Sequence, residues 1–469
     1  MKKAFHLILV LLVISCSQTK KQAFDIVLKN GNVIDLETGA ITRQNIFIND
    51  GRIAKIISSE SDFQYQTENE INAENNYILP GFWDNHVHFR GGDSLIQENK
   101  NLLPLFTANG ITTVRDAGGD LTSSVHSWQK EIEAGELVGP TIFTSGPKID
   151  GPNATWAGSL VVENENDIST ALDSLQALKT DFVKLYDSRI SGDLYLKTIE
   201  EAKKRGLITS GHKPFTVTLD ETINAGISGI EHLYYIMKGC SSEETSVTEK
   251  LKSKEIGFWQ AMPILQSTYQ DSTAQNTFLR LKENGVYVIP TLHIGETLSY
   301  LDEVDHQNDD YLKYMGKGIV KTYQGRIKRA LNASEKAAKD RKELDMFFGS
   351  LTKSLSDAEV KLLAGSDSGA FNSYTYSGIS LHNELEAMVK TGMSPLKVLQ
   401  TSAYNGATFL KKDTDYGIIA KGKVADLVVL TANPLDDIRN TKKISHVIQG
   451  NRTYNKQQLD ALLRALLSS

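Results

Sequence analysis

The chain has 469 residues and a formal net charge of −6, and 40% of its residues are hydrophobic. This length exceeds one ordinary domain of about 100–200 residues, but it suits one large domain with a smaller unit beside it. No basic stripe is present, so nucleic acid is not an expected partner. The only cysteines are Cys16 and Cys240, which excludes a disulfide framework.

The first residues have the pattern of a targeting segment. Lys2 and Lys3 precede a short apolar stretch, residues 4–14, which is too short to span a bilayer as a helix. Residues 13–16 read Val-Ile-Ser-Cys, which resembles a bacterial lipobox. We therefore predict a lipoprotein signal peptide at 1–15, lipidation of Cys16 and a polar tether at 16–24. The protein would then sit at the bacterial cell envelope, with membrane contact only through the lipid anchor.

Both ends of the remaining chain have β character. Residues 25–35 and 45–57 alternate around Asn-Gly and Asp-Gly turns, which are hairpin signals. Residues 426–430 and 444–452 have the same character. The pattern predicts that residues 25–79 and 411–469 pair into one small β-sandwich domain.

The middle of the chain, residues 80–410, alternates short apolar runs with helical patterns, which indicates βα units and a parallel sheet. Helices are expected at Leu194–Arg205 and Leu381–Thr391, and the charged insertion 293–360 is expected to form helices over the mouth of the domain. Eight candidate strands are present, which predicts an α/β fold of the (β/α)8 TIM-barrel type. They are Phe82–His88, Ile111–Ala117, Thr141–Ser145, Phe182–Tyr186, Ile208–His212, Gly229–Leu233, Val286–Leu292 and Lys361–Asp367.

Potential metal ligands and one lysine stand at the strand ends, where barrel active sites form. They are His86, His88, Lys184, His212, His232 and Asp367. In a strand, residues i and i+2 face the same side, so His86 and His88 can hold one ion together. Each residue alone has a simpler interpretation, such as a core histidine, a helix cap or a lysine that reaches solvent. Their joint placement favours a metal site.

Lys184 differs from the other candidate ligands, because an ammonium group cannot bind a cation. A buried lysine loses its proton readily. The neutral amine can then add carbon dioxide and become a carbamate, an anion with two oxygens that can bridge two metal ions.

Several motifs resemble the amidohydrolase superfamily of metal-dependent hydrolases. Residues 79–88 read Leu-Pro-Gly-Phe-Trp-Asp-Asn-His-Val-His, and residues 110–119 read Gly-Ile-Thr-Thr-Val-Arg-Asp-Ala-Gly-Gly. Shorter matches are Val-Lys-Leu-Tyr at 183–186, Gly-His at 211–212, Ile-Glu-His at 230–232 and Gly-Ser-Asp-Ser-Gly at 365–369. Residues 417–430 also match. Within the superfamily the chain resembles the imidazolonepropionase-like and Xaa-Pro or Xaa-Arg dipeptidase-like branch.

This resemblance implies a binuclear site. One divalent ion would be held by His86, His88 and Asp367, and the second by His212 and His232, with Lys184 as the bridge. Zinc is the default metal for such ligands. Asp367 would be the catalytic base that takes a proton from the attacking water. Relatives often carry Gly-Gly-His after the third strand, whereas residues 146–148 read Gly-Pro-Lys, so substrate choice is expected to differ.

Other residues have weaker indications. Tyr234, Tyr235 and His293 follow strands and are candidates for substrate contact, although packing explains the tyrosines equally well. Arg115 and Asp116 are expected to be structural, as second-layer groups or an internal ion pair. Cys240 is expected to be a packed small side chain.

Three functions are compatible with these features to different degrees. The sequence favours a binuclear hydrolase that cleaves the amide bond of a dipeptide or an N-acyl amino acid, with a homo-oligomer possible. The alternative is a cyclic-amide hydrolase or a deaminase of the same superfamily. The third hypothesis is a non-catalytic surface lipoprotein that binds a ligand.

Overall fold

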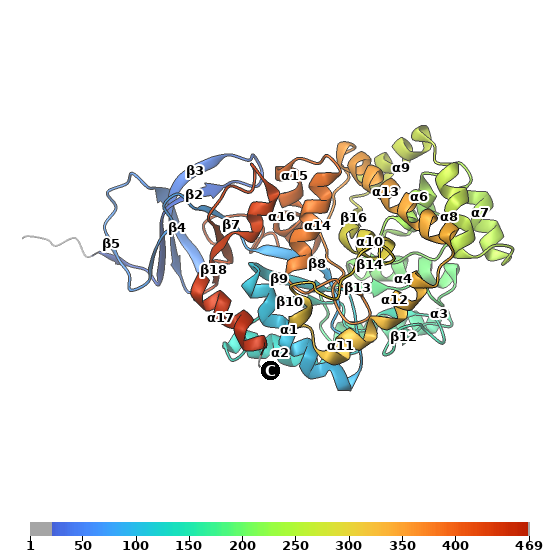
Figure 1. Cartoon of the computed structure of the whole chain (residues 1–469), viewed down its shortest axis with the longest axis horizontal. Coiled ribbons are helices and arrows are strands. Elements are labelled where there is room, and N and C mark those ends of the chain that lie inside the picture. The colour runs from blue at the N-terminus through green and yellow to red at the C-terminus, as the bar shows by residue number, and fades with distance from the viewer. Residues whose placement is uncertain (1–20, 468–469) are drawn as a thin grey trace, which may run out of the picture.

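The computed structural model describes residues 21–467. The predicted signal peptide at 1–15 and the lipidation site Cys16 lie outside these residues. The described chain contains parallel strands surrounded by helices, with an antiparallel β unit at one end (Figure 1). The predicted α/β class is therefore confirmed.

Seven of the eight predicted parallel strands are present, close to their expected positions. They are β8 (Phe82–Val87), β9 (Ile111–Asp116), β10 (Thr141–Thr144), β13 (Val183–Leu185), β14 (Thr209–Gly211), β15 (Gly229–Glu231) and β16 (Tyr287–Ile289). They form two parallel sheets, β10-β9-β8 and β12-β11-β13-β14-β15-β16, in which β11 is Ile149–Asp150 and β12 is Leu160–Val161.

The eighth predicted strand is not a regular strand. Residues 361–368 nevertheless lie between β16 and β8: the amide of Val288 donates to Lys361 O over 3.0 Å, and the amide of His88 donates to Ser368 O over 2.9 Å. Asp367 has a left-handed backbone (φ 54°), which interrupts an extended conformation here. The closed eight-stranded barrel stays a prediction.

Helices follow most of the parallel strands. The predicted helices at 194–205 and 381–391 are confirmed as α4 and α14, and the insertion 293–360 is helical as expected. The helices are α1 (Ile96–Ala108), α2 (Thr122–Ala134), α3 (Glu165–Ala177), α4 (Gly192–Lys204), α5 (Leu219–Ala225), α6 (Tyr234–Gly239), α7 (Glu244–Lys252), α8 (Phe258–Ser267), α9 (Asp271–Glu283), α10 (Leu292–Ser299), α11 (Lys317–Thr322), α12 (Gln324–Leu331), α13 (Glu335–Asp357), α14 (Ile379–Lys390), α15 (Pro395–Gln400), α16 (Ala403–Phe409) and α17 (Lys456–Leu466). A second helical excursion, α6–α9 between β15 and β16, was not expected.

Helix α4 illustrates why the sequence forms these elements. Ser191 caps its N-terminus by accepting a hydrogen bond from the amide of Leu194. Tyr195, Ile199 and Ala202 are buried at helical spacing and face the neighbouring elements. Lys203 and Lys204 lie in the last turn, where positive charge is favourable.

The two ends of the chain pair as predicted, but in one sheet. Its order is β19-β18-β17-β7-β2-β3-β4, and β6 pairs with β2. Ile53 in β4 and Ile448 in β18 belong to one apolar cluster, although several strands separate them in this order, so the sheet encloses a shared core. The sandwich is therefore seen in part. The strands are β2 (Ile26–Ile34), β3 (Ile41–Asn49), β4 (Arg52–Ser58), β6 (Glu70–Asn72), β7 (Tyr77–Pro80), β17 (Leu427–Leu430), β18 (Ile444–Gln449) and β19 (Arg452–Asn455).

Two boundaries differ from the sequence prediction. Residues 22–24, expected in the tether, belong to the folded part, because β1 (Gln22–Ala23) pairs with β5 (Tyr65–Gln66) and the Phe24 ring is buried against Phe47. At the other end, residues 456–466 form α17, which packs on α1 instead of joining the sheet (Figure 1).

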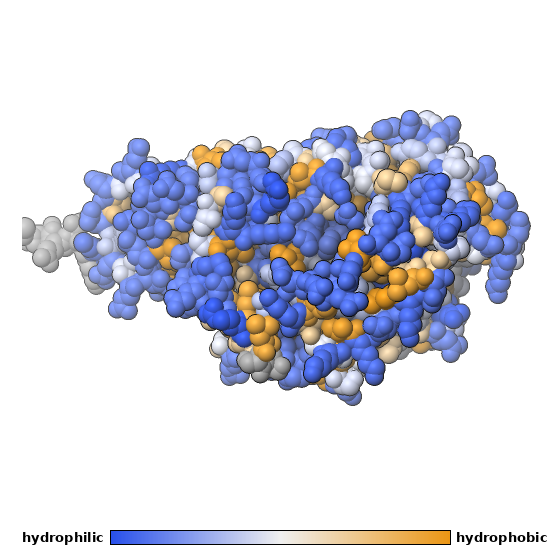
Figure 2. Space-filling view, viewed as in Figure 1, coloured by the Kyte–Doolittle hydropathy of each residue, from blue (hydrophilic) through white to orange (hydrophobic). Residues whose placement is uncertain are grey.

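The surface in Figure 2 is largely hydrophilic, with smaller apolar areas between the charged side chains. Within residues 21–467, no helix has the length and apolar character needed to cross a bilayer. Cys240 is buried and forms no disulfide with another described residue, which confirms its expected packing role.

Candidate metal centre

Two of the predicted ligands leave β8 on the same face. The Nε2 atoms of His86 and His88 lie 3.1 Å apart, and they are 3.6 and 3.1 Å from Asp367 Oδ1. Glycines allow this close approach. A Cβ at Gly365 would lie 2.5 Å from His86 Cβ, and one at Gly369 would lie 2.4 Å from the carbonyl oxygen of His88.

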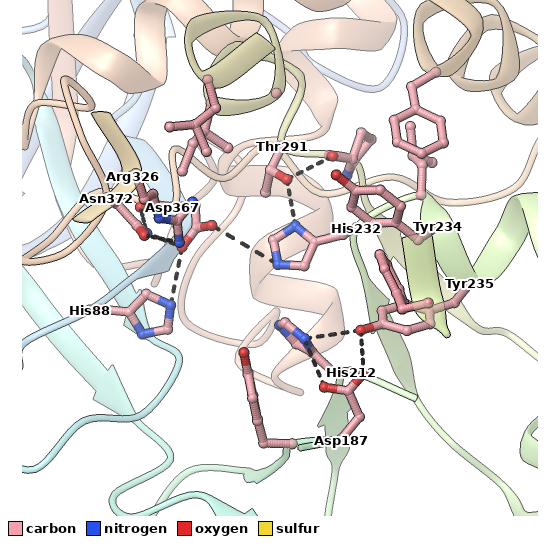
Figure 3. A pocket seen from close by; sticks show the side chains of 18 of the residues that line it. His88, Asp187, His212, His232, Tyr234, Tyr235, Thr291, Arg326, Asp367 and Asn372 are labelled. Atoms are coloured by element: carbon pink, nitrogen blue, oxygen red, sulfur yellow. Dashed lines mark hydrogen bonds and ion pairs between the residues drawn. The ribbon is translucent and has the colours of Figure 1, made fainter. Parts of the chain in front are cut away.

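The other two histidines come from the next strands around the site. His212 follows β14 and His232 follows β15, with their ring centroids 4.8 Å apart. His232 Nε2 lies 4.0 Å from Asp367 Oδ2, and its ring centroid is 5.4 Å from that of His86. The structure therefore gathers all four predicted histidines and Asp367 into one cluster (Figure 3 shows His88, His212, His232 and Asp367).

The hydrogen bonds of His88 and His232 fix which ring nitrogen carries the proton. His88 Nδ1 lies 2.9 Å from Gly118 O, which can only accept. His232 Nδ1 lies 2.7 Å from Thr291 Oγ1, and that hydroxyl donates a hydrogen bond to Pro290 O. Both Nδ1 atoms therefore donate. Each Nε2 keeps a free lone pair, as a metal ligand requires.

His212 is oriented in a similar way. Its Nδ1 lies 3.0 Å from the hydroxyl of Tyr235 and 3.4 Å from Asp187 Oδ1. The Tyr235 hydroxyl donates to Asp187 Oδ2 over 2.8 Å, so its oxygen is available to accept from His212. Tyr235, predicted as a substrate contact, thus also positions a candidate ligand.

Burial keeps the four imidazoles neutral. It lowers the pKa of His86 and His88 well below 6.5, and it lowers the pKa of His232 to about 3. The pKa of His212 is also lowered by burial. Burial alone would raise the pKa of Asp367, but neighbouring groups, including the charge of Arg90, hold that pKa below its ordinary value. Neutral imidazoles around a carboxylate are the protonation states that bind a cation.

The donor set fits a divalent metal. His86, His232 and Asp367 each offer a ligand atom, and these atoms lie within 4.8 Å of one another. The Nδ1 atom of His86 is buried and has no hydrogen-bond partner among the described residues. Imidazole and carboxylate together suit zinc and metals of similar preference.

Lys184 is fully buried in β13, and its Nζ contacts Glu231 Oε2. Burial and the charges of Lys148 and Arg115 lower the pKa of Lys184 well below its ordinary value. Because its head group contacts a carboxylate in this structure, the bridging carbamate stays a prediction.

Glu231 was missed by the sequence reasoning, although it stands next to His232 in the Ile-Glu-His motif. It accepts hydrogen bonds from Arg115 Nη2 and Ser210 Oγ, each over 3.0 Å. Arg115 therefore has the structural ion-pair role expected of it, with Glu231 as its partner. Asp116 instead accepts a hydrogen bond from Thr144.

A cavity of about 370 Å³ opens onto this cluster. Tyr234 and Tyr235 line it as expected, but His293 does not. His293 lies in the first turn of α10, where the amides of Leu292 and His293 donate to Glu384 of α14. This places the His293 ring beside α14, with its Nε2 3.4 Å from Asn383 Nδ2. The prediction of a substrate contact for His293 is therefore not supported by its placement.

Polar residues that the sequence reasoning did not single out also line the cavity. They are Arg90, Lys148, Asp187, Arg326 and Asn372. Asn372 donates to Asp367 Oδ1 over 2.7 Å and so orients the carboxylate. Burial lowers the pKa of Arg90 to about 10, and burial with the charge of Arg90 lowers the pKa of Lys148 to about 7. The only sequence signals for them were the position of Arg90 two residues after His88 and the altered loop around Lys148.

Comparisons with known proteins show similar sequences and similar folds. Ochratoxinase from Aspergillus niger is 20% identical over 464 residues, covering 86% of this chain and 81% of that protein. The structure is similar to that of bottromycin amidohydrolase, with a TM-score of 0.75, 20% identity and coverage of 94% of this chain and 89% of that one. A Xaa-Pro dipeptidase with bound methionine in its active site has a TM-score of 0.66 and 20% identity, covering 92% and 99% of the two chains.

The profile of the amidohydrolase family matches residues 77–452, which is most of the chain and includes every histidine and carboxylate of the cluster. The protein therefore belongs to the amidohydrolase family.

Proposed function

We propose that this protein is a metal-dependent hydrolase that cleaves the amide C–N bond of a dipeptide or an N-acyl amino acid. The observation that carries the proposal is the convergence of three neutral histidines on the carboxylate of Asp367 beside an open cavity, with His212 next to them. Its relatives include a dipeptidase, an amidohydrolase and an ochratoxinase, which supports the same class of reaction.

Two divalent ions, zinc by default, would be held by His86, His88 and Asp367 and by His212 and His232, with Lys184 as the predicted bridge. Such ions lower the pKa of a bound water to about 7 and polarise the carbonyl to be attacked.

The residues of the chain supply proton transfer and positioning. Asp367 is the proposed base, which takes a proton from water and returns it to the leaving amine. Asn372 holds one carboxylate oxygen of Asp367 by donating to it. Gly118, Thr291 and the Tyr235–Asp187 pair fix the histidine rings, so the site is organised before substrate binds.

We also propose that the parallel strands close into the (β/α)8 barrel through residues 361–368. The hydrogen bonds of this segment to both β16 and β8 support closure there. Closure would place Asp367 between β8, which contributes His86, and β16.

A deaminase is the second candidate. An adenine deaminase from Bacillus subtilis is 36% identical over 99 residues, although these cover only 21% of this chain and 15% of that protein. Mononuclear deaminases usually lack the fourth-strand lysine, so Lys184 favours the hydrolase.

The test is a substrate panel with zinc-loaded protein. Dipeptides, N-acyl amino acids, a cyclic amide and adenine are incubated separately, and released amine or ammonia is measured. We expect release from linear amides only. Hydrolysis of adenine or the cyclic amide without release from any linear amide would overturn the proposal.

A further inference from the structure

Three cationic side chains line the cavity beside the metal centre: Arg90, Lys148 and Arg326. Arg90 and Lys148 are only 4% and 3% exposed. Among residues 21–467, none of the three has a carboxylate partner within 4.0 Å, and each donates a hydrogen bond to an uncharged oxygen. Burying cations without a carboxylate in direct contact is costly, so this arrangement indicates an anionic ligand.

Arg90 is held in one orientation. Its Nε donates to Ala370 O over 2.8 Å, and the guanidinium carbon lies 4.0 Å from the ring centroid of Trp156. Stacking fixes the plane of the group and leaves both Nη atoms without a partner in the described chain. A planar guanidinium fork matches a carboxylate through two parallel hydrogen bonds.

Arg326 reaches the same cavity from α12, in the insertion between β16 and residues 361–368. Its Nη2 donates to Asn372 Oδ1 over 2.7 Å, and Asn372 in turn donates to Asp367. Figure 3 shows Arg326, Asn372 and Asp367 next to one another on one side of the cavity. An anion bound by Arg326 would therefore lie close to the reacting atoms.

Lys148 supplies the third charge from the loop before β11. Its Nζ donates to Gly118 O over 2.9 Å, the same carbonyl that orients His88. The three head groups offer more hydrogen-bond donors than the roughly four acceptor sites of one carboxylate. Two carboxylates would match them better.

The other wall of the cavity is aromatic. The ring of Tyr234 lies 5.5 Å from Phe258, 6.3 Å from Trp259 and 5.0 Å from Phe348, between centroids. Trp259 is 62% exposed although it lines the cavity. In Figure 3 Tyr234 stands across His232 from Arg326. This wall suits an apolar or aromatic group.

We propose that the substrate is an amide that joins an aromatic or apolar group to an acidic amino acid. The two carboxylates of that amino acid bind the cationic group Arg90, Lys148 and Arg326, and the apolar group packs on the wall formed by Tyr234, Phe258, Trp259 and Phe348. This inference rests on the proposed amide hydrolysis and names its substrate class.

The first experiment compares zinc-loaded full-length protein on Phe-Asp, Phe-Asn and Phe-Ala. Asparagine has nearly the shape of aspartate without the second negative charge. We expect kcat/KM for Phe-Asp to exceed that for Phe-Asn by about 10-fold or more, because charge-assisted hydrogen bonds are the stronger kind. A kcat/KM for Ala-Asp about 10-fold below that for Phe-Asp would support binding of the apolar group on the aromatic wall.

A matched pair of variants assigns the preference to the cationic group. Arg326→Gln should bring the Phe-Asp to Phe-Asn ratio close to 1. Arg329→Gln, exposed on the same helix and outside the cavity, should leave the ratio unchanged. Metal content is measured for both variants, because Arg326 is linked through Asn372 to Asp367.

Calorimetric titration with N-acetylaspartate and N-acetylasparagine gives a readout independent of turnover. Tighter binding of N-acetylaspartate, lost in Arg326→Gln, supports binding of two carboxylates by the cationic group; if no amide is cleaved as well, the amide hydrolysis fails and this binding site stands. Equal hydrolysis of Phe-Asp, Phe-Asn and Phe-Ala would overturn the inference and leave the amide hydrolase intact. Equal binding of the two N-acetyl compounds, without turnover, would overturn both.

Discussion

Individual hydrogen bonds determine which ring nitrogen of His88 and His232 can bind a metal ion. His232 can offer its Nε2 lone pair because the Thr291 hydroxyl accepts a hydrogen bond from Nδ1 and donates its own hydrogen bond to Pro290 O. His88 depends in the same way on Gly118 O. Partners of this kind typically affect metal affinity by about 10–100-fold.

Thr291→Val tests this arrangement, because valine keeps the shape and removes the acceptor. We expect zinc affinity to fall by about 10-fold or more, measured by competition with a chromophoric chelator. Thr322→Val, a substitution outside the cavity, is the control. Equal affinities for wild type and Thr291→Val would show that the tautomer of His232 is set by something else.

Asp367→Asn tests the proposed base. Asparagine keeps the size and one oxygen but lacks the basic carboxylate, so we expect kcat to fall by about 10²–10⁴. Metal content must be measured on the same sample, because Asp367 is also a proposed ligand. His126→Asn, on α2 outside the cavity, is the control. Full activity of Asp367→Asn with both metals bound would exclude it as the base.

Among the elements, the irregular segment 361–368 is the one that brings its backbone directly against the candidate metal-binding histidines of β8. It hydrogen bonds to β16 and β8 while Gly365 and Gly369 let the backbone pass directly against His86 and His88. The left-handed backbone of Asp367 lies between these glycines. The close approach of this segment to β8 thus depends on the two glycines, which have no side chain.

Gly365→Ala should therefore disturb both stability and metal binding. The added Cβ would lie 2.5 Å from His86 Cβ and 2.9 Å from its amide nitrogen, so the segment must shift. Overpacking of this kind costs about 1–3 kcal/mol, which thermal unfolding would detect, and zinc content should fall. The control is Gly349→Ala in α13, where the nearest non-neighbouring atom would be 3.8 Å away and alanine favours a helix. If both variants behave alike, the close approach is not important.

For the molecule as a whole, what the sequence could predict depends on how far local patterns determine contacts. The position of His86, His88, His212 and His232 followed from strand ends, because parallel strands bring their carboxyl ends to one edge. The one-sheet arrangement of the termini did not follow, since alternation marks strands but not their partners.

The contributions of Arg90, Lys148 and Arg326 were also beyond the sequence. Arg326 belongs to a charged helix whose polar residues predict only a solvated face, and the path of the insertion brings it into the cavity. His293 is the opposite case: the sequence predicted it in the cavity, but it lies in the first turn of α10 with its ring toward α14. Loop and helix paths of this kind are set by tertiary packing.

The anchor prediction applies to residues outside those that the structure describes. We propose that Cys16 carries a lipid, so Cys16→Ala should move the protein from the membrane fraction to the soluble fraction while amide hydrolysis is kept. Cys240→Ala is the control for a cysteine change, although loss of a buried side chain can lower its stability. Unchanged membrane partition of Cys16→Ala would show that the lipobox interpretation is wrong.

Metal removal should destabilise the whole fold, because the proposed ligands lie between residues 86 and 367 and come from five separate segments, counting that of the bridging Lys184. An ion that binds only the native state at about 100 times its Kd adds about 2.7 kcal/mol, which for a domain of this size corresponds to a rise in Tm of several degrees. Chelation should therefore lower Tm, and zinc should restore it. His86→Asn should have a lower Tm that chelation changes much less, whereas His446→Asn, on β18 away from the cavity, should respond like wild type. A Tm that stays constant while bound metal falls to zero would show that the cluster does not join these segments through a metal ion.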